Sequence, residues 1–277
     1  MQKSILITGC SRGGIGYATA LALKERGHRV FATARSPEEV QRLRNAGFEA
    51  FRLDVTDTET IDNALDAVLA CTGGTLDALF NNAGYGQPGA LEDVPTQALR
   101  EQFETNVFGL HELTRRVIPV MRRQGHGRII QHSSVLGLIS LRFRGAYNAS
   151  KYAIEGLCDT LRLELMGENI HVSTLNTGPV RSRFRDNATK KFLGSIDMEH
   201  SVHKTEYESE VLKRKTQKEE KDRFTKDPDV VVERVIHALE SNVPKARYHI
   251  TTATYLLAAF KRLLPTATLD RLLRGIQ

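Results

Sequence analysis

A tyrosine and a lysine four residues apart, Tyr147 and Lys151, are the side chains of this sequence best suited to move a proton. On a helix, residues at this spacing share one face, so the phenol and the ammonium would lie side by side. The positive charge favours the phenolate and is expected to lower the pKa of Tyr147 from its unperturbed value of about 10. Such a pair is common in helices, so the rest of the chain must decide whether it performs chemistry.

Ser134 adds a hydroxyl group just before this pair. Residues 127–132 form an apolar run that predicts a buried strand, and residues 145–167 have the composition of a helix. A serine at the end of such a strand can hydrogen-bond to the oxygen of a substrate. The stretch from Ser134 to Lys151 therefore indicates a candidate acid–base site.

The beginning of the chain predicts a phosphate-binding turn. Residues 4–8 form a short apolar strand, residues 9–16 are rich in glycine, and residues 17–27 are helical in composition. Glycines let the backbone approach a pyrophosphate, and the start of a helix supplies N–H groups and a positive dipole. A turn of this kind between a strand and a helix is typical of dinucleotide binding.

The next predicted strand, residues 28–35, ends on Arg35, and Arg12 lies in the glycine-rich turn. An acid at such a strand end binds the 2′-hydroxyl of NAD, whereas a base accommodates the 2′-phosphate of NADP. The arginines therefore favour NADP(H), the alternative being that Arg35 is only a solvated residue after a strand.

Strands and helices alternate along the chain, which predicts an α/β fold of the Rossmann type, with one doubly wound parallel sheet in a single domain over residues 1–277. Further strands are expected at residues 48–53, 76–80, 169–176 and 247–251, and helices at 37–46, 56–70, 96–121 and 230–241. Ligands bind at the carboxyl ends of strands in such sheets. Asp54, Asn81 and Ser134 each follow a strand and so fall on that edge.

Composition describes an ordinary globular protein of 277 residues, with 40% hydrophobic and 26% charged residues. The three scattered cysteines, Cys10, Cys71 and Cys158, predict neither a disulfide framework nor a metal site and fit a reducing compartment. No signal peptide and no apolar run of membrane-spanning length are visible. We therefore expect a cytoplasmic protein.

Two segments depart from this pattern. Residues 181–226 are dominated by charge and predict an exposed helical excursion that acts as a lid. The tail, residues 252–277, has an apolar and basic pattern interrupted at Pro265, in a chain of net charge +6. That tail can pack on the fold, form an oligomer contact or lie on an anionic membrane surface, and its basic residues can equally be a solvated helix face.

Taken together, these motifs resemble the short-chain dehydrogenase/reductase family over essentially the whole chain. The residues that carry the resemblance are Thr8, Gly9, Gly14, Ile15, Gly16, Asp54, Val55, Asn81, Asn82, Ala83, Gly84, Asn106, Ser134, Tyr147 and Lys151. Within the family, the chain is similar to bacterial NADP-dependent aldehyde and ketone reductases, a branch related to steroid and retinol dehydrogenases.

The resemblance implies a division of roles. The catalytic residues would be Asn106, Ser134, Tyr147 and Lys151. The cofactor, NADP(H), would be held by Gly9, Ser11, Arg12, Gly14, Ile15, Gly16, Arg35, Asp54, Val55, Asn82, Ala83, Gly84, Tyr147, Lys151, Gly178, Val180 and Ser182. Tyr147 would act as general acid on a carbonyl oxygen, Lys151 would tune the phenol and hold the ribose, and Asn106 would serve a proton relay through water and Lys151.

Two departures from the family pattern bear on these roles. The glycine-rich turn has one extra residue, so Gly13 and Gly14 compete for its middle position. After the sixth strand, the usual Pro-Gly is Thr177-Gly178, and Ser182 stands where a threonine is usual. The hydroxyl of Ser182 is kept, so its contacts to the cofactor are expected to survive.

The substrate is less clearly indicated. Leu136, Leu141, Phe143 and Phe184 flank the catalytic positions and are candidates for an apolar pocket, although ordinary packing is an equal alternative. We expect a small apolar aldehyde or ketone as substrate and a dimer or tetramer as assembly. The alternatives are a lipid, steroid or retinoid enzyme at a membrane surface and an NADP(H) sensor without turnover. The basic residues form no recognised nucleic-acid-binding motif, so no nucleic-acid partner is expected.

Overall fold

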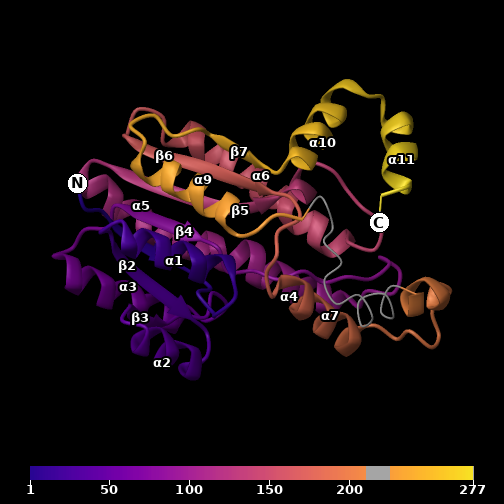
Figure 1. Ribbon diagram of the computed structural model, residues 1–277, viewed down its shortest axis with the longest axis horizontal. Helices are drawn as coiled ribbons and strands as arrows, with labels where there is room; N and C mark the ends of the chain where they lie inside the picture. Colours follow the sequence, from indigo (N-terminus) through magenta and orange to yellow (C-terminus); the bar gives the residue numbers. More distant parts are fainter. Residues whose placement is uncertain (210–224, 277) are drawn as a thin grey trace.

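The computed structural model describes residues 1–209 and 225–276, which form a seven-stranded parallel sheet with helices on both faces (Figure 1). The predicted Rossmann-type α/β fold is confirmed. The strands are β1 Ser4–Ile7, β2 Arg29–Ala34, β3 Glu49–Arg52, β4 Ala78–Asn81, β5 Gly127–Ser134, β6 Ile170–Thr177 and β7 Arg247–Ile250. Their order across the sheet is β3-β2-β1-β4-β5-β6-β7.

The α-helices are α1 Ile15–Glu25, α2 Pro37–Asn45, α3 Thr58–Thr72, α4 Thr96–Phe103, α5 Gly109–Gln124, α6 Gly145–Glu164, α7 Phe184–Ser195, α9 Asp229–Glu240, α10 Thr252–Leu263 and α11 Thr266–Arg274. A π-helical turn, η1 Glu104–Phe108, joins α4 to α5, and a 3₁₀ turn, η2 Val135–Gly137, follows β5.

Two apolar layers enclose the sheet. On one face, α1, α2 and α9 pack on the sheet, and on the other α3, α5 and α6 do so. The strands between them are apolar on both sides, as in β1, whose four residues are all buried. Helices on both faces exclude water from a parallel sheet, which explains the continuous apolar runs in the sequence.

The chain reverses direction across the sheet at β1. From β1 it moves outward through β2 to β3 and then returns to β4 on the other side of β1. Such a reversal leaves a crevice at the carboxyl ends of the two neighbouring strands, where α/β proteins bind ligands. The glycine-rich turn after β1 and the residues after β4 therefore face each other across this crevice.

Residues 96–121 are helical as expected, but a π-helical turn interrupts the segment. Helix α4 ends at Phe103, and the π-helical turn η1 holds Asn106 before α5 begins at Gly109. A π-helical turn inserts one extra residue into a helix and is frequent at functional sites. Asn106, in the middle of this turn, is 1% exposed.

The predicted lid is only partly described, because residues 210–224 lie outside the described residues. The described part begins with α7 and contains its own small apolar cluster, in which Phe192, Ile196 and Tyr207 pack on Ala90. Tyr207 also donates a hydrogen bond to the carboxylate of Asp93 at 2.6 Å. This part is anchored to the domain, so the expectation of a wholly exposed excursion is wrong for it.

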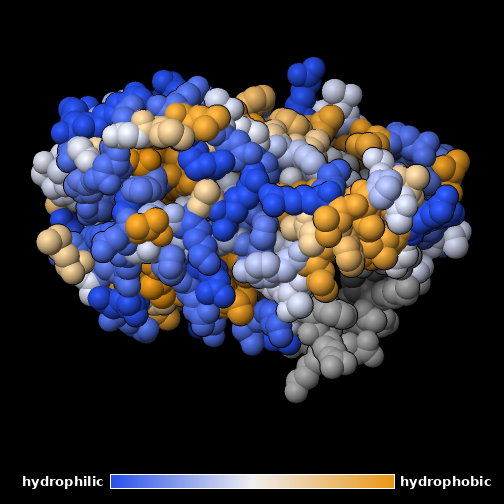
Figure 2. Space-filling view, turned by 90° about the horizontal axis from the view of Figure 1, so that it is seen from above, coloured by the Kyte–Doolittle hydropathy of each residue, from blue (hydrophilic) through white to orange (hydrophobic). Residues whose placement is uncertain are grey.

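The tail packs on the fold. Helix α10 ends at Leu263 and α11 begins at Thr266, so the interruption lies at Pro265 as predicted. Leu269 and Leu273 are buried at 4% and 7% exposure against Leu136 and Ile139. Apolar side chains also remain on the outer surface at this end of the molecule, as Figure 2 shows in its right half. Within the described ranges, no helix combines the length and the apolar character needed to cross a membrane.

Candidate active site

The predicted serine, tyrosine and lysine meet at the carboxyl end of β5. Ser134 is the last residue of β5, and its Oγ accepts a hydrogen bond from the Leu136 N–H at 3.1 Å in the turn η2. This turn redirects the chain toward α6, which carries Tyr147 and Lys151 on one face. Ser134 and Tyr147 also share a side-chain hydrogen bond. The arrangement expected from spacing alone is therefore present.

Tyr147 lies in apolar surroundings, with the ring of Phe184 at a centroid distance of 5.4 Å. Burial raises the pKa of Tyr147 to about 12, although part of its side chain stays accessible, and the hydrogen bond with Ser134 opposes the rise. The expectation that Lys151 brings the pKa of Tyr147 below its usual value is wrong. Desolvation disfavours the phenolate, and it outweighs an ammonium 5.5 Å from the ring centroid.

Lys151 is 6% exposed, and its Nζ donates a hydrogen bond to the backbone carbonyl of His132 at 2.6 Å. Burial lowers the pKa of Lys151 to about 8, while the carboxylate of Glu155 opposes the shift. A buried ammonium with one backbone partner keeps two N–H donors for other groups. The geometry thus leaves Lys151 able to bind a polar ligand beside Tyr147.

Asn106 is held by Tyr85 and Ser150. Its Oδ1 accepts from the Tyr85 N–H at 3.1 Å, and its Nδ2 donates to the Tyr85 carbonyl at 2.9 Å and to Ser150 Oγ at 3.2 Å. Lys151 bonds elsewhere, so these two side chains do not hydrogen-bond each other directly. The relay through water that the family resemblance implies stays a prediction.

The glycine-rich turn is built as a cradle at the start of α1. Gly9 has φ +73°, in the left-handed region that favours glycine. A Cβ at Gly16 would lie 2.6 Å from the Gly9 carbonyl and 2.6 Å from Asn82 Nδ2, so a side chain there would close the turn. Gly14 is the N-cap of α1 and exposes the N–H groups of the first helical turn.

The extra residue of this turn is accommodated at Gly13. Gly13 has φ +79° and is exposed, whereas Gly14 and Gly16 lie at and in the first turn of the helix. The side chain of Arg183 covers Gly13, with its Cδ 3.3 Å from a Cβ built there, and its guanidinium donates to the Arg12 carbonyl at 3.4 Å. Arg183 was not among the predicted residues, because only the tertiary fold brings it to the turn.

Arginines surround the turn. Arg12 is exposed, and the side chain of Arg35 is 81% exposed, with its Nε 3.9 Å from Asp54. Arg12 and Arg183 thus lie at the glycine-rich turn, and Arg35 follows the end of β2. The one carboxylate that contacts the turn among the described residues is Glu39, which accepts from the Arg12 N–H at 3.3 Å and pairs with Arg42. A cradle that a Cβ would fill and a surplus of exposed guanidinium groups fit a dinucleotide with an extra phosphate.

A partly buried hydrogen-bond network joins the ends of four strands, β1, β4, β5 and β6, and the sequence did not reveal it. Asn82 Nδ2 donates to the carbonyls of Thr8 and Gly9, which turns its Oδ1 toward His132 Nδ1 at 2.9 Å. His132 Nδ1 must therefore carry the proton, and Nε2 accepts from the Thr177 hydroxyl at 3.0 Å. Burial lowers the pKa of His132 to about 3, so the ring stays neutral. The signal in the sequence was a histidine inside an apolar strand run.

The remaining predicted cofactor residues line the same edge. Asp54 Oδ1 accepts from the N–H and hydroxyl of Thr56, which leaves Oδ2 facing Arg35. Val55 is buried and follows Asp54 after β3. Ala83 and Gly84 follow β4, where the Ala83 N–H donates to the Thr8 hydroxyl at 2.9 Å.

Beyond β6 lie Gly178, Val180 and Ser182. A Cβ at Gly178 would lie 2.2 Å from Thr251 Oγ1, so this glycine is needed for the close approach of the residue preceding α10. Val180 pairs with Lys226 in a parallel bridge, and Ser182 Oγ accepts from the Phe184 N–H at 3.4 Å. The structure thus keeps these residues next to the β5 and β6 ends.

The four predicted substrate residues separate into two groups. Phe184 touches Tyr147, and Leu136 and Leu141 share an apolar cluster with Tyr147 and the tail helices. Phe143 packs instead on the lid, with Tyr207 and His203 at centroid distances of 5.5 and 5.2 Å. The sequence did not predict that α10 and α11 supply part of the wall beside Tyr147.

Comparisons with known proteins agree with this architecture. The family model for short chain dehydrogenase matches residues 3–192. The oxidoreductase YbbO of Escherichia coli K12 is 42% identical over 275 residues, covering 99% of this chain and 95% of that protein. Human retinol dehydrogenase 8 is 35% identical over 206 residues, covering 71% of this chain and 63% of that protein.

Solved structures are similar over the whole chain. A short-chain dehydrogenase from Streptomyces avermitilis has a TM-score of 0.79 at 30% identity and covers 100% of this chain and 98% of its own. A short-chain dehydrogenase from Burkholderia cenocepacia, solved in complex with NADP, has a TM-score of 0.75 at 23% identity and covers 99% and 100% of the two chains.

Proposed function

The chain is an oxidoreductase of the short-chain dehydrogenase/reductase family, and from that premise we propose that it reduces an apolar aldehyde or ketone to the alcohol with NADPH. The observation that carries the proposal is the meeting of Ser134, Tyr147 and Lys151 at the end of β5, beside the phosphate-binding turn. A hydroxyl, a phenol and an ammonium at one strand edge form a set that can bind and protonate an oxyanion.

The preference for NADP(H) is supported by Arg12 and Arg183 at the glycine-rich turn and by Arg35 directly after β2. Guanidinium groups bind phosphate oxygens in a bidentate way, so this cluster suits a 2′-phosphate. The Burkholderia structure in complex with NADP agrees with this choice. When bound, the cofactor supplies the hydride that adds to the carbonyl carbon.

In the proposed reaction, Ser134 and Tyr147 donate hydrogen bonds to the carbonyl oxygen, and Tyr147 passes its proton to the oxygen as negative charge grows there. The raised pKa of Tyr147, about 12, keeps the phenol protonated at neutral pH and so suits it to the role of donor. Lys151 holds its ammonium next to the phenol and has donors left for the cofactor ribose.

The apolar character of the substrate is supported by the surroundings of Tyr147. Phe184 lies against its ring, and Leu136 and Leu141 belong to the apolar cluster that the tail completes. Two relatives are named after apolar substrates: retinol dehydrogenase 8 and a 3-ketodihydrosphingosine reductase of Bacteroides thetaiotaomicron. Lipid-like carbonyl compounds therefore belong in any substrate panel.

The test is NADPH oxidation by the purified protein with a panel of an aliphatic aldehyde, a ketone, retinal and a steroid ketone. Tyr147→Phe should lower kcat by about 10²–10⁴-fold because it removes the proton donor, while NADPH binding measured by fluorescence stays intact. Tyr255→Phe, the same change on the exposed side of α10, is the control and should leave kcat unchanged.

Two results would contradict this assignment. Full turnover by Tyr147→Phe would exclude the phenol as the acid. NADPH binding without turnover of any member of the panel would favour a cofactor sensor instead.

A second candidate, an enzyme acting at a membrane surface, is favoured by α10. Leu256 and Leu263 are 52% and 78% exposed on this helix, and Arg271 and Arg274 follow on α11. Exposed apolar and basic residues together suit an anionic lipid surface. Because the tail is part of the core, its deletion would disturb the fold; Leu256→Ser with Leu263→Ser should abolish co-sedimentation with anionic vesicles if this candidate is right.

The proposed assembly is a dimer or tetramer. Helix α6 exposes Leu157 and Leu163 at 40% and 65%, and such side chains suit burial against a second copy. Light scattering on the purified protein measures its molecular mass and so distinguishes a monomer, a dimer and a tetramer.

A further inference from the structure

Helix α6 buries a second charged side chain, Glu155, one turn after Lys151. Glu155 is 6% exposed, although carboxylates are rarely buried without a reason. Residues four apart share one face of a helix, so Glu155 lies on the same side of α6 as Lys151. A Cβ built at Gly137 would lie 3.0 Å from the Lys151 carbonyl and 3.1 Å from Glu155 Cγ, so both residues lie beside the turn η2.

Two neighbouring strands hold the carboxylate of Glu155 in place. Its Oε1 accepts from Asn176 Nδ2 of β6 at 2.7 Å, and its Oε2 accepts from Arg247 Nε of β7 at 3.2 Å. A carboxyl group that accepts on both oxygens, one of them from a guanidinium, is bound in its ionised form. The same Asn176 amide also donates to the Ser134 carbonyl at 3.5 Å, so the network reaches the backbone of the predicted catalytic serine.

Arg247 is shared between two carboxylates. Its Nη2 donates to both oxygens of Asp159, at 2.7 and 2.6 Å, and Asp159 also accepts from Arg162 at 2.6 Å. Asp159 lies two helical turns from Lys151, and its side chain is 44% exposed, against 8% for Glu155. Water screens a charge at the surface more than a buried one. Glu155 is therefore the carboxylate of this cluster that acts most strongly on Lys151.

Three other titratable side chains surround Lys151, and none of them carries a charge at neutral pH. Burial raises the pKa of Tyr147 to about 12 and lowers the pKa of His132 to about 3. Burial also raises the pKa of the Cys158 thiol. Burial lowers the pKa of Lys151 itself to about 8, and the charge of Glu155 opposes this shift. The ammonium of Lys151 thus has Glu155 as its charged counterpart.

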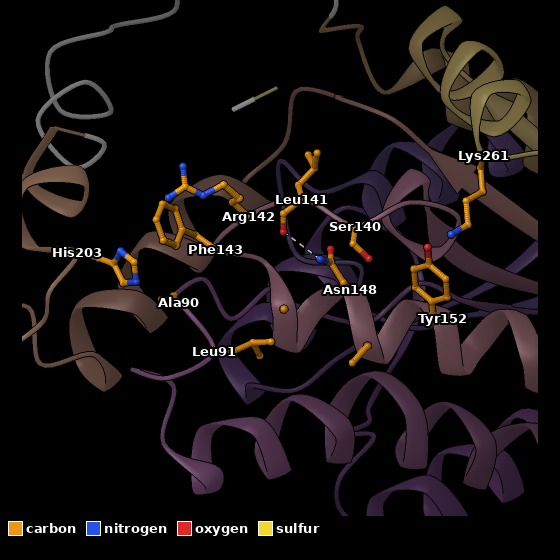
Figure 3. A pocket seen from close by; sticks show the side chains of 13 residues that line it. Ala90, Leu91, Ser140, Leu141, Arg142, Phe143, Asn148, Tyr152, His203 and Lys261 are labelled. Atoms are coloured by element: carbon orange, nitrogen blue, oxygen red, sulfur yellow. Dashed lines mark hydrogen bonds between the residues drawn. The ribbon is translucent and has the colours of Figure 1, made fainter. Parts of the chain in front are cut away.

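Glu155 lies apart from the pocket beside the first half of α6. This pocket of about 710 Å³ is lined by Asn148 and Tyr152 of the helix, among others, and neither Lys151 nor Glu155 lines it (Figure 3). A substitution at Glu155 therefore leaves the walls of the pocket unchanged, and its effect on Lys151 can be measured separately.

We propose that Glu155 is a positioning residue of the site: its buried carboxylate keeps the ammonium of Lys151 charged at neutral pH, and Asn176 and Arg247 hold that carboxylate in place. In the proposed reaction, the charged Lys151 binds the cofactor ribose beside Tyr147. The inference rests on the proposed function only for its effect on turnover, because the charge of Lys151 is measurable without added cofactor.

The test is an NMR titration of the full-length protein with lysine labelled with ¹³C at Cε, in which Lys151→Met identifies the signal of Lys151. Glu155→Gln keeps the shape of the side chain and removes its charge. It should move the titration midpoint of Lys151 to lower pH by about half a unit or more. The alkaline limb of kcat/KM for NADPH oxidation should move in the same direction, because this ratio reports the free enzyme.

Asp159→Asn is the matched control, since it makes the same carboxylate-to-amide change on the same helix, beside the same arginine. It should move the midpoint less than half as far as Glu155→Gln does. Glu155→Asp keeps the charge and should hold the midpoint closer to that of the wild type. Arg247→Gln removes the cation and keeps the carboxylate, so it should move the midpoint to higher pH, and it tests the proposal even where Glu155→Gln does not fold.

Three results would overturn the proposal: a midpoint of Lys151 that is the same in the wild type and Glu155→Gln, a midpoint that moves equally in Asp159→Asn, or an alkaline limb that stays in place while the midpoint moves. A midpoint that moves as expected in a protein that turns over no member of the substrate panel would support the role of Glu155 and contradict the proposed function instead.

Discussion

At the scale of single residues, burial of Tyr147 affects its pKa more than the positive charge of Lys151 does. The ammonium of Lys151 donates a hydrogen bond to the His132 carbonyl. Phe184 and the tail pack beside the phenol of Tyr147 and shield it from water. Loss of hydration raises the pKa of Tyr147, so the phenol keeps its proton at neutral pH. This arrangement suits the reduction direction.

His132 is the residue whose role the structure adds. Its ring connects Asn82, next to the glycine-rich turn, with Thr177 at the end of β6. Only the tautomer with a proton on Nδ1 satisfies both partners. The ring therefore acts as a neutral positioning group for the edge of the sheet that the proposed cofactor would contact.

We predict that His132→Leu destabilises the protein by about 2–4 kcal/mol at pH 7, because Asn82 Oδ1 and the Thr177 hydroxyl lose their partner. It should also raise KM for NADPH more than it lowers kcat. Urea unfolding and steady-state kinetics measure the two effects.

The same histidine predicts a pH dependence. Because its pKa is about 3 in the folded chain and about 6.5 when unfolded, the unfolded chain binds the proton first as pH falls. The advantage of the wild type over His132→Leu should then shrink by up to about 1.4 kcal/mol per pH unit between pH 6.5 and 3. A difference between the two proteins that stays constant over this range would show that His132 does not titrate as described.

At the scale of elements, the π-helical turn and the start of α5 fix how the helices meet the carboxyl edge of the sheet. The turn buries Asn106, and Gly109 follows directly at the start of α5. A Cβ at Gly109 would lie 2.3 Å from the Val55 carbonyl. Close contact between α5 and the end of β3 therefore depends on glycine at this place.

Gly109→Ala should destabilise the protein by about 1–3 kcal/mol, because the helix has to move away from Val55. Gly156→Ala is the matched control: this glycine lies in the middle of α6 with no atom within 4 Å of an added Cβ, so alanine should stabilise by about 0.5–1 kcal/mol. Thermal unfolding of both variants tests the pair. Equal effects would mean that the contact with Val55 does not constrain α5.

At the scale of the whole molecule, the tail closes the site from the far end of the chain. Leu269 and Leu273 of α11 cover the loop after β5 and join the cluster that contains Tyr147. Residues more than a hundred positions apart thus form one apolar wall. The tail is a structural part of the domain, and its outer face is free for other contacts.

Leu269→Ala should destabilise the protein by about 2–4 kcal/mol and raise KM for an apolar carbonyl substrate, because it opens a cavity beside Leu136. Leu272→Ala on the same helix removes a side chain that is 40% exposed and should cost less than about 0.5 kcal/mol. Chemical unfolding and substrate kinetics compare the two. A KM unchanged in Leu269→Ala would separate the tail from the substrate site.

The sequence by itself determined the features that depend on short spacing. Alternating apolar runs predicted the parallel sheet, the glycine-rich run predicted a tight turn between β1 and α1, and the spacing of Tyr147 and Lys151 predicted their shared face. These properties follow from local backbone geometry, which a few neighbouring residues define.

Only the tertiary structure decided the rest. The direction of the Tyr147 pKa depends on desolvation, and desolvation depends on which distant residues cover the ring. Arg183 reaches the turn at Gly13, and His132 meets Asn82 and Thr177, through contacts between segments far apart in the chain. The packing of the tail also depends on contacts between distant segments. The sequence of an amphipathic helix shows that its apolar face will be buried, but not which surface will cover it.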